Sequence, residues 1–165
     1  MALEAGQFVL PLSVTSPTDI GRLLRELDVL DNELMQYELK GTIANAKMPK
    51  TTKLLDDFIS ANKLDLIDAT QRQQFISFLN GLKNHAPVLH ISFGADPAPA
   101  FIERLITWLR QNINPLVLIT IGLQPNIGAG CLVRSTNKYF DFSLRENFTK
   151  NRELLMANLR EVVTA

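Results

Sequence analysis

The sequence predicts an α+β fold, in which an N-terminal helical, bundle-like region (residues 1–86) precedes a small α/β sandwich (residues 87–165). In the first region, large apolar residues recur three and four positions apart, which is the spacing of one helix face. Beyond Pro87, short β-prone runs alternate with helical patterns in the order strand, helix, strand, hairpin and helix. Between the two regions, Asn84-His-Ala-Pro87 breaks the helical pattern, because a proline disfavours helix in the preceding residue. We therefore expect two domains that meet at this break.

Size and composition set broad limits on function. The chain has 165 residues, 46% of them hydrophobic and 21% charged, which is a globular composition. Its formal net charge of zero removes a general electrostatic attraction to nucleic acid or anionic lipid. Cys131 is the single cysteine, so neither an intrachain disulfide nor a cysteine-based zinc site can form. No leader-like segment or apolar run of about eighteen residues is present. We therefore expect a cytoplasmic location without direct membrane insertion.

The first long helix is predicted from Ser16, as N-cap, and Pro17, in the first helical position, to an end at Gly41. One face has heptad-like apolar spacing and consists of Ile20, Leu23, Leu27, Leu30 and Leu34. Two interpretations of this face remain open. It receives a helix of a partner protein, or it packs against the chain's own next helices.

Two further helices complete the first region. Thr51 or Thr52 caps one of them, and Asp68 caps the other, with Gln71 at the capping-box position. Each carries a run of apolar residues suited to burial, and residues 41–50 between the first and second helices are expected to form a loop.

The second region begins with a predicted strand at Val88–Phe93, and a helix follows with Asp96 as N-cap and Pro97 as its first residue. The nearly continuous apolar run Leu116–Leu123 predicts a central strand. A hairpin is predicted around the turn Ser135-Thr-Asn137, because the β-prone residues Leu132 and Val133 precede it and Tyr139, Phe140 and Phe142 follow it. Ser143-Leu-Arg-Glu146 then matches a capping box that begins the final helix. That helix carries Phe148, Leu155 and Leu159.

We identify no catalytic, cofactor-binding or metal-binding residues. His85 and His90 lack the spacing of metal ligands. The glycine-containing segment 122–130 lacks the Gly-Lys-Ser/Thr ending of a phosphate loop and leads into a strand where that motif needs a helix. Aromatic residues on the strands, such as Tyr139, leave open a single-stranded nucleic-acid platform. Without a basic excess, packing is the preferred interpretation, and we expect no nucleic-acid partner.

The span from Pro87 onward resembles the C-terminal domain of the delta subunit of F-type ATP synthase, the oligomycin-sensitivity-conferring protein of mitochondria. The resemblance is carried by ordered short motifs: Val88–Ser92, Gln124-Pro125, Ile127-Gly128, Arg134, Asn137-Lys138 and Asp141-Phe-Ser143-Leu-Arg145. One extra residue lies in the glycine turn, and Phe142 stands where the family has glycine. The N-terminal half lacks the family's Tyr-Ala-x-Ala-Leu opening.

The resemblance implies a non-catalytic peripheral-stalk (stator) subunit that links the catalytic head to the stalk and supports proton-driven ATP synthesis. The implied partners are the N-terminal helices of the alpha subunits and the b subunit of the stalk, and the chain would reach the membrane only through the complex. The candidate contacts with partners are the five apolar residues of the first helix named above, together with Phe148, Leu155 and Leu159. An α/β adaptor that binds proteins outside any ATPase is the alternative.

Overall fold

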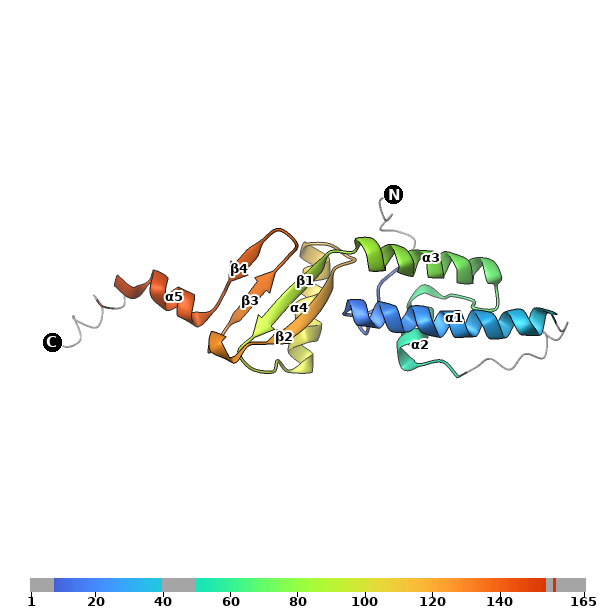
Figure 1. Cartoon of the computed structure of the whole chain (residues 1–165), viewed down its shortest axis with the longest axis horizontal. Helices are drawn as coiled ribbons and strands as arrows, with labels where there is room; N and C mark the ends of the chain where they lie inside the picture. Colours follow the sequence, from blue (N-terminus) through green and yellow to red (C-terminus); the bar gives the residue numbers. More distant parts are fainter. Residues whose placement is uncertain (1–7, 40–49, 154–155, 157–165) are drawn as a thin grey trace. The chain divides into compact units, whose positions relative to one another are not determined.

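A computed structural model of the chain describes residues 8–39, 50–153 and 156. The fold is α+β, as predicted, with three helices before a four-stranded sheet in the described residues (Figure 1). The elements are α1 (Pro17–Leu39), α2 (Lys53–Asn62), α3 (Ala69–His85), β1 (Val88–Phe93), α4 (Pro99–Asn112), β2 (Leu118–Leu123), the 3-10 helix η2 (Pro125–Ile127), β3 (Cys131–Arg134), β4 (Tyr139–Asp141) and α5 (Leu144–Lys150).

The chain divides into two compact units. The first consists of Met1–Pro87 and Leu105–Leu118, and the second of Val88–Arg104 and Ile119–Ala165. One break between the units falls after Pro87. The second half of α4 groups with the N-terminal helices, however, and not with the sheet. Each unit is described by itself below.

The core of the first unit is built on one face of α1. Ile20, Leu23 and Leu27 are fully buried, and Leu30 and Leu34 are each 3% exposed. This face packs within the chain, where α1 lies against α3 and α2. Of the two interpretations of the heptad face, the structure supports packing against the chain's own helices. The expected role of these five residues as contacts for a partner helix is corrected accordingly.

Side chains that cap helix starts fix where the N-terminal helices begin. The amide of Asp19 donates to Ser16 Oγ at 3.3 Å, and Asp19 Oδ2 accepts from the amide of Ser16 at 2.9 Å. Thr52 Oγ1 accepts from the amide of Leu55. These two caps agree with the sequence prediction, since Thr52 is one of the two residues expected to cap α2. The predicted end of α1 at Gly41 lies outside the described residues.

The cap of α3 is confirmed for Asp68 and corrected for Gln71. Asp68 accepts from the amide of Thr70 at 2.8 Å, and this bond is the main reason that the pKa of Asp68 lies below its usual value. Gln71 Oε1 accepts instead from the amide of Asp65 at 3.0 Å. Gln71 therefore holds the loop before α3 by this bond, and does not complete a capping box.

The sheet of the second unit has the strand order β2-β1-β3-β4, and Figure 1 shows the strands side by side in this order. β3 pairs antiparallel with both β1 and β4. Between β1 and β2, the amides of Leu118 and Gln124 donate to the carbonyls of Pro87 and Phe93, so partner numbers rise together on both strands. β1 and β2 are therefore parallel, and α4 provides the crossover that a parallel pair requires.

Two predicted boundaries are displaced. α4 begins at Pro99 and not at Pro97, because Ala98 precedes a proline and is disfavoured from helical conformation. The carbonyl of Ala98 then accepts the first bonds of the helix, from Phe101 and Ile102. β2 begins at Leu118, two residues later than expected, and it is an edge strand of the sheet and not the predicted central strand.

The glycine turn before β3 lies closely against neighbouring backbone. Gly130 has φ of +91°, and a Cβ there would lie 2.2 Å from the carbonyl oxygen of Phe142. A Cβ on Gly94 would lie 2.8 Å from the oxygen of Gly128. Only glycine fits at these points of close approach. The turn consequently meets the start of α5, where the amide of Leu144 donates to Ala129 at 2.9 Å.

Candidate interaction surfaces

The first candidate surface is an apolar groove between the glycine turn and α5. Leu144 and Phe148 lie one turn apart on α5, and Met156 lies beyond the end of this helix; the three side chains are 49%, 54% and 45% exposed. The groove has a volume of about 750 Å³. Its lining consists of Asn126, Ile127, Gly128, Ala129, Leu144, Arg145, Phe148, Thr149, Arg152 and Met156. Exposed apolar side chains that line one groove form a stripe of the kind that receives another helix. We call these residues the α5 groove.

The direction of α5 is set at Ser143, which is only 4% exposed. Its hydroxyl accepts from the amide of Glu146 at 3.2 Å, which satisfies a free donor in the first turn of the helix. Its own amide donates to Asp141 Oδ1 at 2.8 Å. Residues from β4 and the cap thus orient the α5 groove relative to the sheet. The predicted N-cap at Ser143 is confirmed, and the partner of its amide is Asp141.

The predicted contact residues divide into three groups. Phe148 lies exposed in the α5 groove. Leu155 and Leu159 lie outside the described residues. The five residues of α1 belong to the core, as stated above, and of these only Leu30 also lines one of the hollows in the described residues.

The second candidate surface is the face of the sheet opposite the buried Ile91 and Phe93 of β1. Here the antiparallel register places His90 opposite Arg134, and Arg134 opposite Tyr139, in one row across β1, β3 and β4. A hollow of about 770 Å³ lies over this row. It is lined by Val88, His90, Ser92, Gln124, Leu132, Arg134, Ser135, Thr136 and Tyr139. We call this surface the open sheet face.

The aromatic residues of the strands do not form one platform. Phe93 is buried and meets Phe101 of α4 edge-on, with ring centroids 5.8 Å apart. Tyr139 lines the open sheet face, and the adjacent Phe140 points to the opposite side, because successive strand residues alternate. Phe140 stacks on Phe142 at 6.1 Å. A stacking surface for successive bases would need these rings on one face.

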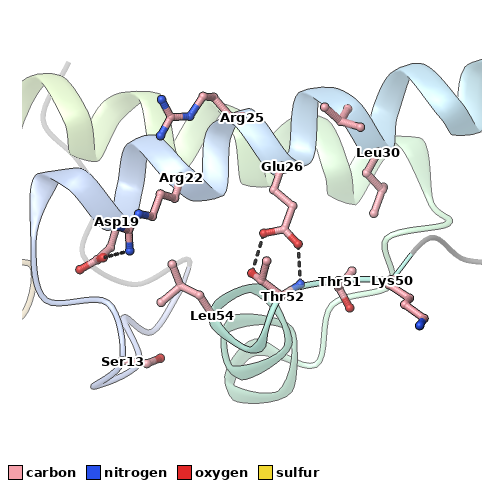
Figure 2. Close-up of a pocket in the computed structure, with 11 residues that line it drawn as sticks. Ser13, Asp19, Arg22, Arg25, Glu26, Leu30, Lys50, Thr51, Thr52 and Leu54 are labelled. Atoms are coloured by element: carbon pink, nitrogen blue, oxygen red, sulfur yellow. Dashed lines mark hydrogen bonds and ion pairs between the residues drawn. The ribbon is translucent and has the colours of Figure 1, made fainter.

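The third hollow lies in the first unit between α1 and the start of α2, and has a volume of about 660 Å³ (Figure 2). Its acidic groups bond to the protein itself. Glu26 accepts from the amide and hydroxyl of Thr52 at 2.6 and 2.7 Å, and Asp19 lies 3.9 Å from Arg22. Glu26 of α1 lies at the N-terminus of α2, where the helix dipole favours a negative charge. The side chains of this hollow therefore connect the two helices.

Reactive groups contribute little to these surfaces. Among the described residues, no cluster of three His, Cys, Asp or Glu side chains could hold a metal ion. Burial raises the pKa of the Cys131 thiol, which keeps it protonated at neutral pH. None of the helices in the described part of the chain is long and apolar enough to cross a membrane.

The sequence alone did not reveal the open sheet face. His90, Arg134 and Tyr139 are separated along the chain, and only the register of three strands brings them into one row. The alternation of side chains in β1 was the one available signal, since it put His90 on the face opposite the core. No protein-family model matches the chain, and no curated protein matches it significantly. Function must therefore be inferred from the residues and their arrangement.

Proposed function

We propose that this chain is a non-catalytic peripheral-stalk subunit of an F-type ATP synthase. It links the catalytic head to the stalk, supports proton-driven ATP synthesis, and is held at the cytoplasmic side of the membrane through the complex. The observation that carries the proposal is the α5 groove. The groove presents an exposed apolar stripe beside a turn whose backbone packs closely against the start of α5. Such a surface suits a subunit that holds another helix.

The arrangement of the motif residues supports this proposal. The order strand, helix, strand, hairpin and helix agrees with what the resemblance to the delta subunit implies. The motif residues Asp141 and Ser143 make the cap of α5, and Gly128 lines the groove beside it. Lys138 closes the hairpin turn through its carbonyl, which accepts from Ser135 at 2.8 Å. The residues that carry the resemblance thus shape one end of the second unit.

A stator resists rotor torque, so its contacts must be strong without being reactive. Burying a large apolar side chain that is about half exposed stabilises a contact by about 1 kcal/mol, roughly half the value for full burial. Phe148, Leu144 and Met156 together therefore provide a few kcal/mol. Arg145 and Arg152 line the same groove and can pair with carboxylates on the stalk helix.

Contact with the alpha subunits must use a surface other than the buried face of α1. Met35 and Leu39 near the end of α1 are 57% and 80% exposed. They lie four residues apart on one side of the helix. We assign them as the apolar residues of the first unit that meet the catalytic head.

Replacing Phe148 by Asp in the tagged full-length chain tests the stalk contact. Placing a charge in the apolar stripe should weaken association with the b subunit at least about tenfold, because desolvating a carboxylate opposes binding. Asn147→Asp adds the same charge to an exposed position of α5 outside the groove and should bind like the original chain. Binding is measured by co-purification and by titration with the b subunit, and circular dichroism verifies the fold. Equal binding by both variants would remove the α5 groove as the stalk contact.

A further inference from the structure

We infer that the open sheet face is a second docking site, which binds a helix of a partner protein through acidic side chains. This inference rests on the proposed function, because the partner is sought within the same assembly. It concerns a different surface from the α5 groove. Its central residues are His90, Arg134 and Tyr139.

The two faces of the sheet differ sharply in exposure. On β1, Ile91 and Phe93 are 2% and 8% exposed, whereas His90, which precedes them on the other face, is exposed. On β4, Tyr139 is 61% exposed. Arg134 stands between His90 and Tyr139 in the cross-strand row. A guanidinium is therefore presented at the centre of the open sheet face, flanked by two rings.

A hollow lies beside this row. Ser92 occupies the position on β1 that follows His90 on the same face, and it pairs with Leu132. Neighbouring β2 has Gly122 here, and a Cβ on that glycine would lie 3.2 Å from Ser92 Oγ. Gly122 lies on the edge strand β2, and its lack of a side chain leaves Ser92 uncrowded. The open sheet face is concave over β1 and β3, where the hollow of about 770 Å³ lies.

The chemistry of the open sheet face complements carboxylates. Its nine lining residues include Arg134 and several neutral donors, the groups of Ser92, Gln124, Ser135 and Tyr139 among them, and no Asp, Glu or Lys. Asp141 lies in the adjacent row, but its carboxylate accepts from the amide of Ser143. Arginine binds a carboxylate through two parallel bonds, and Arg and Tyr are enriched at binding hot spots where Lys, Asp and Glu are depleted.

The architecture indicates that the occupant is a helix. Helices are the elements that cover sheets in α/β layer architectures, and the layer described over this sheet is itself a helix. In this unit the start of α4 covers one face, through Phe101 against Phe93. The described residues supply no second layer, since His90, Arg134 and Tyr139 remain exposed. A helix from a partner would complete the sandwich and place its acidic side chains over Arg134.

Charge reversal tests this site in the full-length chain. Arg134→Glu should weaken association with the assembly at least tenfold, because like charges then face each other. Arg104→Glu is the matched control, since Arg104 is an exposed arginine of the same unit on α4. It should change association less than twofold. Circular dichroism verifies that both variants fold.

Cross-linking identifies the occupant. A photoreactive benzoylphenylalanine in place of Tyr139 should cross-link to a helical, acidic segment of another subunit. Replacing the acidic residue found there by Arg should restore most of the association of the Arg134→Glu variant. Cross-links to a second copy of this chain or to no protein, or equal association of the Arg134→Glu and Arg104→Glu variants, would overturn the inference.

The outcomes separate this site from the stalk function. If Phe148→Asp releases the chain from ATP synthase and Arg134→Glu does not, the stalk function stands and the open sheet face is not a docking site. If position 139 cross-links to an acidic helix of a protein outside ATP synthase, the docking site stands and the stalk function is wrong.

Discussion

Arg110 of α4 holds the loop before α1 through contacts outside the apolar core of the first unit. Its guanidinium donates to the carbonyls of Leu10 and Pro11 at 3.0 and 2.9 Å and also to that of Val14. Burial lowers the pKa of Arg110 to about 10, so the side chain still carries its charge at neutral pH. A single arginine on α4 thus binds three carbonyls of the loop that precedes α1.

Replacing Arg110 by Met should lower the free energy of unfolding by about 2–3 kcal/mol, because three carbonyls lose a charged donor. Arg104→Met on the same helix should change it by less than about 0.5 kcal/mol, since Arg104 is exposed. Chemical denaturation followed by circular dichroism measures both values. Similar losses in the two variants would mean that the carbonyl contacts of Arg110 contribute little.

At the scale of single elements, α5 depends on its cap more than a long helix would. It spans Leu144–Lys150, and helices this short have little stability of their own. Ser143→Ala should therefore destabilise this end of the second unit by about 1 kcal/mol and weaken binding of the stalk helix. Hydrogen exchange of the α5 amides measures the first effect. Ser60→Ala, at an exposed position inside α2, is the control and should cause no loss.

The starts of helices were predictable where a side chain bonds to a backbone amide a few residues away in the sequence. Ser16, Thr52, Asp68 and Ser143 all occupy the positions that capping chemistry assigns to them. Boundaries failed where backbone context decides. The start of β2 was placed too early, because Asn114 folds the residues before it into a turn by accepting from the amides of Leu116 and Val117. An apolar run alone does not reveal such a turn.

At the scale of the whole molecule, periodicity identified which face of α1 is apolar but not what covers it. A heptad face packs equally well on a partner or on the chain's own helices. The structure shows the second arrangement, with Leu27 fully buried. The open sheet face lay beyond sequence reasoning for a related reason. Its row depends on strand register, which places His90 opposite Arg134. In the sequence, α4 and β2 lie between these two residues.

The most direct test of the stator role is the coupling of ATP hydrolysis to proton pumping in membrane vesicles that lack this chain. A stator holds the head still against the rotor, so its loss should abolish ATP-driven acidification while ATP hydrolysis continues. Adding the purified chain should restore acidification, and adding the Phe148→Asp variant should not. Acidification that proceeds unchanged without the chain would contradict the proposed function.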